Sequence, residues 1–259
     1  MKKLIAVSFF MIALLACQSD DQAIKSEATI SFNFSHNWDG TMVSNSDFNN
    51  IQYTNAHGDI LSIERLRYLI SKITFHKSNG EKIVLDGYNL VDVTNGTHLS
   101  FSSKTTIPTG NYSNVSFLFG FDNEDNISGA YPDLNSASWN VPEMLGGGYH
   151  FMQLEGKYIN EQSEEIGYAY HAIRAVDNSD PDNLIFQDTF IEVNLGSVMI
   201  SNDTSFNIEM NIAEWFKNPN TWDLNLLYNS LMPNFNAQVM MYENGKNAFS
   251  LESVSPEND

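Results

Sequence analysis

The sequence predicts an all-β protein, an antiparallel β-sandwich with long loops and one or two short helices. Two observations lead to this prediction: hydrophobic residues recur with a period of two in many short runs, and polar, Asn-rich turns separate these runs. The chain has 259 residues, 42% of them hydrophobic and 12% aromatic, which is enough for a packed core. Nine or so strands connected by turns in this way are typical of one sandwich or open barrel.

The strands follow from the alternation, run by run. In residues 29–34, Ile30, Phe32 and Phe34 share one face, as expected of a half-buried strand. Turn-like clusters such as Ser78-Asn79-Gly80 and Asp180-Pro181-Asp182 separate the later runs. The other strands are expected at residues 68–76, 82–93, 115–121, 149–158, 166–174, 189–195, 205–211 and 237–243.

Two segments predict short helices. Residues 62–69 begin with Ser62, a residue that commonly caps a helix, and polar residues follow it. Residues 212–217 end directly before Asn218-Pro219, which is a typical stop signal. Neither helix changes the predicted class.

The N-terminus predicts a lipoprotein signal peptide over residues 1–16. Lys2 and Lys3 precede an apolar run that is too short to span a bilayer. The run ends in Leu-Leu-Ala before Cys17 and resembles a bacterial lipobox, so we expect Cys17 to carry the lipid that anchors the protein in a membrane. Residues 17–28 are then a tether, and residues 29–259 form the domain. The acidic start of the tether resembles the export tag of surface lipoproteins in Bacteroidota, which predicts an outer-membrane lipoprotein on the cell surface or facing the periplasm.

Composition excludes several classes of function. There are 13 Lys and Arg against 32 Asp and Glu, a formal charge of −19, and no basic cluster, so we expect no nucleic-acid partner. One cysteine excludes a disulfide framework and a thiolate metal cluster. The chain contains no GxGxxG, Walker, GxSxG or HExxH motif, and we expect a non-enzymatic protein.

Three of the six histidines, His36, His150 and His171, lie in strand-like contexts. A hairpin centred between residues 160 and 161 would place His150 directly opposite His171, with Cβ atoms roughly 4.5–5.5 Å apart. Alternation would also place Met152 on the face of His150. Such a pair could share one metal ion, although a register slip of one residue would separate the rings. The remaining histidines lie in turn-like or surface-like positions and are not expected to be ligands: His57, His76 and His98.

The order and spacing of several motifs resemble the MbnP-like copper-binding family, whose members include many Bacteroidota lipoproteins. An early Phe-x-His-x-x-x-Gly motif is matched by Phe34, His36 and Gly40. Further matches extend over nearly all of the mature chain, at residues 66–73 (Leu-x-Tyr-x-x-Ser), 110–122 (Gly-x-Tyr-x-x-Val-x-Phe-x-x-Gly-x-Asp), 139–156 (Trp, then Gly-Tyr and Leu-Glu-Gly), 170–171 (Tyr-His) and 243–249 (Asn-Gly, then Phe).

The resemblance implies a β-sandwich with one copper site, used in copper acquisition, storage or delivery. In the family, histidines hold the copper, in some members together with a tryptophan that a partner di-haem peroxidase oxidises to kynurenine. Position by position, the resemblance implies His36 and His171 as ligands and Trp139 as the modifiable tryptophan, and His150 is a further candidate. A methionine thioether nearby would favour Cu(I); the candidates are Met144 and Met152.

A glycan-binding or adhesion sandwich is the alternative function. Trp38, Trp215 and Trp222, with many Tyr and Phe residues, could form a stacking platform for sugars. This alternative requires at least two tryptophans exposed on one flat face, whereas copper binding requires the three histidines to converge in one pocket. A redox role for the copper would further require an open coordination position beside a substrate pocket.

Overall fold

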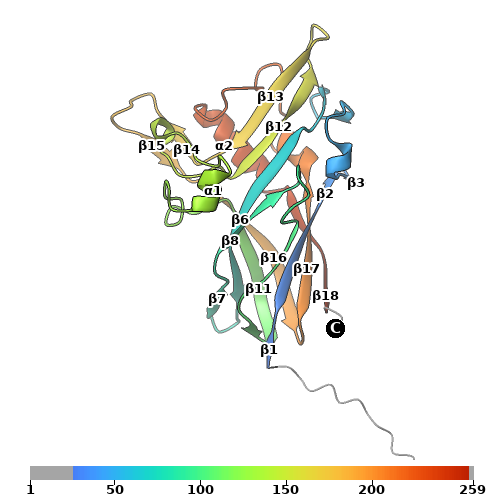
Figure 1. Ribbon diagram of the computed structural model, residues 1–259, viewed down its shortest axis with the longest axis vertical. Coiled ribbons are helices and arrows are strands. Elements are labelled where there is room, and N and C mark those ends of the chain that lie inside the picture. Colours follow the sequence, from blue (N-terminus) through green and yellow to red (C-terminus); the bar gives the residue numbers. More distant parts are fainter. Residues whose placement is uncertain (1–25, 257–259) are drawn as a thin grey trace, which may run out of the picture.

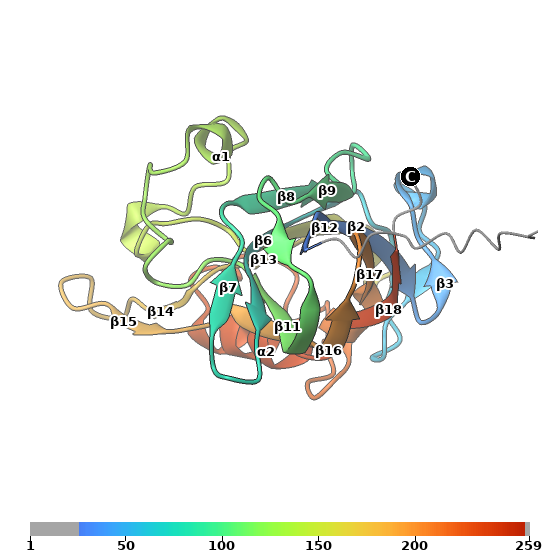
Figure 2. The same cartoon turned by 90° about the horizontal axis from the view of Figure 1, so that it is seen from below.

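The computed structural model describes residues 26–256, whose two larger β-sheets pack as a sandwich (Figures 1 and 2). This confirms the predicted all-β class. The signal peptide, Cys17 and most of the predicted tether lie outside the described residues. Among the described residues, no helix is long and apolar enough to cross a membrane.

The larger sheet carries most of the strands that position the candidate site. Its main order is β16-β11-β6-β12-β5-β4, with β13 paired to β12 and with β7 and β8 paired to β6. The strands are β4 (Tyr53–Thr54), β5 (Ile60–Leu61), β6 (Arg65–His76), β7 (Lys82–Val84), β8 (Tyr88–Asp92), β11 (Gly110–Phe119), β12 (Met152–Ile159), β13 (Glu165–Ala172) and β16 (Ile191–Ile200).

The smaller sheet has the order β18-β17-β2-β3, with β9 paired to β2. Its strands are β2 (Ile30–Trp38), β3 (Thr41–Met42), β9 (Ser100–Ser102), β17 (Thr204–Asn211) and β18 (Phe249–Pro256). The pairing of β2 with β17 is parallel, while the other strand pairs of the described residues are antiparallel. Two further ribbons pair β1 (Glu27–Ala28) with β10 (Ile107–Pro108), and β14 (Ala175–Asp177) with β15 (Ile185–Gln187).

Aromatic side chains from both sheets fill the core between them. Ile30, Phe32 and Phe34 of β2 are buried, as the alternation predicts. The ring of Phe34 packs edge-on against Phe117 of β11 and Tyr68 of β6, with centroids 6.3 and 6.1 Å apart. These contacts join the two sheets and fix which face of β6 points inward.

Short helices complete the fold: α1 (Pro132–Ser136), α2 (Phe235–Gly245) and the 3-10 turns η1 (Asn45–Asp47), η2 (Glu143–Leu145) and η3 (Ile212–Phe216). Figure 1 shows α1, β14 and β15 together on one side of the sandwich. The helical turn predicted at residues 212–217 is confirmed by η3.

Three local predictions were wrong. Residues 62–69 contain no helix, because Leu66 and Tyr68 alternate with polar neighbours and begin strand β6. Residues 237–243 are helical in α2, because the side chain of Asn234 caps the first turn and strong helix formers follow. Residues 27 and 28, placed in the tether, form β1, and Ala28 is fully buried.

Candidate metal site

Two of the three candidate histidines meet at one place on the larger sheet. The ring centroids of His150 and His171 lie 5.2 Å apart in a T-shaped arrangement. His171 belongs to β13, whereas His150 precedes β12 in a segment bridged to the chain beside Trp139. The pair is therefore formed between a strand and a loop.

The predicted hairpin register was wrong by three residues, because His171 pairs with Gln153 of β12 instead of His150. The turn causes this difference. The side-chain oxygen of Asn160 accepts the backbone N–H groups of Gln162 and Glu164, and Ile159 pairs with Glu165, so the hairpin is centred on Gln162.

His150 has one nitrogen hydrogen-bonded and the other without a partner. Its Nδ1 lies 2.9 Å from the backbone carbonyl oxygen of Trp139. A carbonyl only accepts, so Nδ1 carries the proton and Nε2 holds the lone pair. This Nε2 is buried and has no hydrogen-bond partner. Burial lowers the pKa of His150 to about 4, so the ring is neutral at pH 7.

His171 is held by a carboxylate on the same face of the sheet. Its Nε2 donates to Oε1 of Glu155 over 2.8 Å, and Glu155 also accepts from Arg65 over 2.8 Å. Because Nε2 of His171 carries the donated proton, the lone pair of the neutral ring is on Nδ1. The hydrogen bond from His171 lowers the pKa of Glu155. The side chain of His171 lines a cleft of about 440 Å³, together with polar side chains that include Arg67, Asn95 and Gln153.

Trp139 is adjacent to His150. Its ring centroid lies 5.7 Å from that of His150, and the side chain is fully buried. The indole Nε1 is buried without a hydrogen-bond partner, and the guanidinium carbon of Arg67 lies 5.1 Å from the ring centroid. The tryptophan that the resemblance marks as modifiable thus borders the histidine pair.

His36 lies on the other side of the larger sheet. Its Nε2 is 2.9 Å from the hydroxyl of Tyr68, whose side chain packs in the core between the sheets. Arg67, the neighbour of Tyr68 along β6, points to the opposite face, where Gln153 and His171 lie. The structure therefore does not bring the three histidines into one pocket, because β2 presents His36 to the core. Burial lowers the pKa of His36 to about 4.

Neither candidate methionine joins the histidine pair. Met152 is fully buried in the core and pairs with Tyr68 and Ala172. The observed register differs from the predicted one by three residues, and an odd shift moves a side chain to the other face of the sheet. Met152 therefore lies on the face opposite His171, and the prediction that it shares that face was wrong. Met144 lies on η2 and is 76% exposed.

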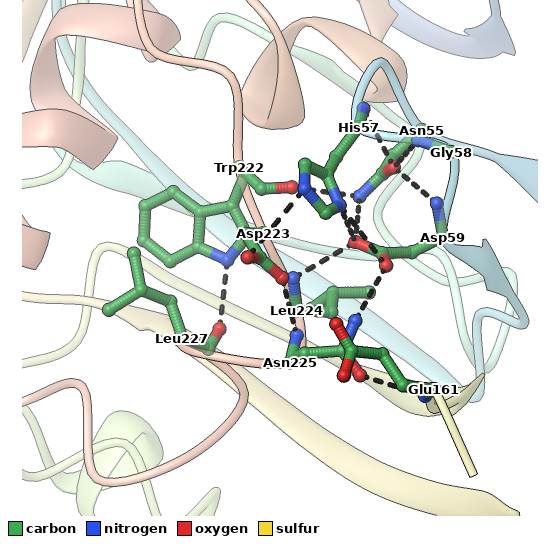
Figure 3. Close-up of polar contacts among 10 residues, drawn as sticks. All are labelled: Asn55, His57, Gly58, Asp59, Glu161, Trp222, Asp223, Leu224, Asn225 and Leu227. Atoms are coloured by element: carbon green, nitrogen blue, oxygen red, sulfur yellow. Dashed lines mark hydrogen bonds and ion pairs between the residues drawn. The ribbon is translucent and has the colours of Figure 1, made fainter.

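A second group of possible ligands was missed by the sequence analysis. His57, Asp59 and Asp223 offer one nitrogen and two carboxylate oxygens that all lie within 4.8 Å of one another (Figure 3). The spacing of His57 and Asp59 in one turn is a weak local signal for such a group. Asp223 is far away in the sequence, and no local pattern indicates that it joins them.

Comparisons with known proteins identify one family. The family model named MbnP matches residues 27–240. Among solved structures, MbnP from Methylosinus trichosporium aligns with a TM-score of 0.49 and 12% sequence identity, covering 77% of this chain and 80% of that chain. No curated protein matches the chain.

Proposed function

Because the chain belongs to the MbnP family, we propose that it is a copper-binding protein and that its copper site is built on His150 and His171. The resemblance of the sequence motifs to the copper-binding family supports the choice of metal. One observation supports the location of the site. The buried Nε2 of His150 has no hydrogen-bond partner, and the ring centroid of His171 lies 5.2 Å from that of His150.

The donor set suits copper. Imidazole nitrogen is a good ligand for copper in both oxidation states. Histidines that bind metals usually donate their other ring N–H to a carbonyl or carboxylate, which fixes the ring. His150 does this with the carbonyl of Trp139, and His171 does it with Glu155. A copper ion bound here would be held by Nε2 of His150 and Nδ1 of His171, and it could be transferred to another protein.

We further propose that the protein acts without catalysis, in copper acquisition, storage or delivery at the outer membrane. The lipobox-like segment ending in Cys17 supports the membrane anchor. The position of Trp139, with its ring centroid 5.7 Å from that of His150, supports a di-haem peroxidase-like partner, because oxidation of this indole would change the surroundings of the same site.

The alternative of a glycan-binding sandwich loses its main support. All four tryptophans, Trp38, Trp139, Trp215 and Trp222, are buried, so none of them offers an exposed surface on which a sugar could stack.

The proposal is tested by Cu(I) binding to the mature chain with Cys17→Ser, which removes a competing thiol. Competition against a Cu(I) chelator under reducing conditions should give one equivalent bound, and His150→Ala or His171→Ala should abolish it. His76→Ala is the matched control, because His76 hydrogen-bonds to Ser116 and should leave binding unchanged. Absence of binding, or binding that neither site variant weakens, would refute the proposal.

A further inference from the structure

The group formed by His57, Asp59 and Asp223 lies where two loops meet. His57 and Asp59 belong to the loop between β4 and β5, and Asp223 belongs to the segment between η3 and α2. Nδ1 of His57 lies 3.3 Å from Oδ2 of Asp59, and Nε2 lies 3.6 Å from Oδ2 of Asp223. Figure 3 shows the imidazole between the two carboxylates.

The carboxylate of Asp59 is buried and held by neutral donors. Its Oδ2 accepts from the side-chain amide of Asn55 over 3.0 Å and from the backbone N–H of Leu224 over 2.9 Å. Its Oδ1 accepts from the side-chain amide of Asn225 over 3.1 Å. A carboxylate has about four lone-pair positions, two on each oxygen, so these donors leave one on Oδ1, which lies 3.4 Å from Nδ1 of His57 and is available to an ion. Such orienting hydrogen bonds are typical of carboxylates that bind metals.

The charge of this group is not balanced by a permanent cation. Among the described residues, Asp59 and Asp223 form ion pairs with His57 and with no Lys or Arg. A neutral imidazole therefore leaves two negative charges side by side, one of them buried. Burying an unpaired charge is costly, so a cation bound here would stabilise the folded protein.

We propose that His57, Asp59 and Asp223 bind a divalent transition-metal ion of the Zn²⁺ type, at a site separate from the copper site. Zn²⁺ lies about 2.0–2.2 Å from nitrogen and carboxylate ligands, which places ligand atoms roughly 3.3–3.5 Å apart in a tetrahedral site. Only one nitrogen of His57 can bind the ion: Nδ1 lies 3.4 Å from Oδ1 of Asp59, and one nitrogen of His57 and one oxygen of each aspartate all lie within 4.8 Å of one another. The imidazole distinguishes this site from a Ca²⁺ site, which takes oxygen ligands.

The exposure of the group fits a bound ion with an open position. The side chain of His57 is 41% exposed, compared with 26% for Asp223 and 6% for Asp59. Solvent can therefore deliver the ion and supply the fourth ligand as water. The ligands come from segments far apart in the sequence, so the complete site exists only in the folded protein, and binding must stabilise the fold.

The test measures Zn²⁺ binding to the metal-stripped mature chain with Cys17→Ser and His150→Ala, which disables the proposed copper site. Calorimetric titration with Zn²⁺ alone should give one equivalent bound, and thermal unfolding should shift to higher temperature. His57→Gln and Asp223→Asn should each weaken binding by about tenfold or more and remove the thermal shift. Both residues lie at the surface of the group, so these variants keep the buried Asp59 in place.

Matched controls separate this site from general surface binding. His98→Gln and Asp188→Asn change an exposed histidine and an exposed aspartate elsewhere and should bind Zn²⁺ like the parent chain. Absence of Zn²⁺ binding, or binding unchanged by both His57→Gln and Asp223→Asn, would overturn the proposal. If these variants lower the unfolding temperature equally with and without Zn²⁺, the group is an ionic link between loops and not a metal site. Loss of Cu(I) binding is a separate result, because this titration uses a chain without His150.

Discussion

The ring Nδ1 of His150 and the backbone N–H of the same residue both donate to the carbonyl oxygen of Trp139, each over 2.9 Å. Two hydrogen bonds to one carbonyl fix the orientation of the ring as well as its tautomer. The loop around Trp139, and not the register of the β12–β13 hairpin, therefore aims Nε2 of His150.

Replacing His36 should leave copper binding intact. In His36→Gln, Cu(I) affinity should equal that of the parent chain, because His36 bonds to Tyr68 on the core side of the sheet while the histidine pair lies on the other face. Chelator competition measures this directly. A large loss of affinity in this variant, with normal circular dichroism, would show that the three histidines converge in the bound state.

Stability should fall as the pH drops below about 6.5. The pKa values of His36 and His150 are lowered from 6.5 to about 4 in the folded chain, so between these values the unfolded chain binds more protons. Each histidine should therefore reduce the unfolding free energy by roughly 1 kcal/mol per pH unit in this range. Urea unfolding at pH 7, 6 and 5 measures the slope. His36→Gln should make the slope clearly shallower, and an unchanged slope would contradict the assignment.

Gly156 should not tolerate a side chain. A Cβ atom there would lie 2.1 Å from the backbone carbonyl oxygen of Ser62, which cannot move without disturbing the sheet. Gly156→Ala should cost roughly 1–3 kcal/mol or more of unfolding free energy. Gly167→Ala on the paired strand is the control, because its nearest atom would be 3.9 Å away. Equal stabilities of the two variants in urea would show that the contact is relieved cheaply.

Membrane attachment should depend on Cys17. A lipidated cysteine holds a protein at the membrane through its acyl chains, so Cys17→Ser should move the protein from the membrane fraction to the soluble fraction or leave it uncleaved. Fractionation followed by immunoblotting distinguishes these results. Unchanged membrane partitioning of the variant would contradict the lipoprotein prediction.

Much of the fold could be predicted from local pattern, because alternation directly encodes a half-buried strand. Ile30, Phe32 and Phe34 show this clearly. Residues 237–243 are a short, mainly apolar run that fits a strand or a helix, and the cap at Asn234 favours the helix.

The candidate site was less predictable. The nearness of His150 and His171 was anticipated, but the reason was wrong, since a loop provides the contact. Which way His36 points depends on which sheet covers β2, and that is decided by residues far along the chain. The same limit applies to Asp223, which reaches His57 only through the complete fold.

The parallel pairing of β2 with β17 has a consequence for how the chain folds. Ile30 pairs with Thr204 and Asn37 with Asn211, so the first long strand gains this neighbour only when most of the chain is available. Contacts between such distant residues slow folding, because a long loop must close before they form. Until then the hydrophobic row of β2 has an open edge of unpaired backbone groups, which is a template for aggregation. We therefore expect β2 to be prone to aggregation until residues 204–211 are available to pair with it.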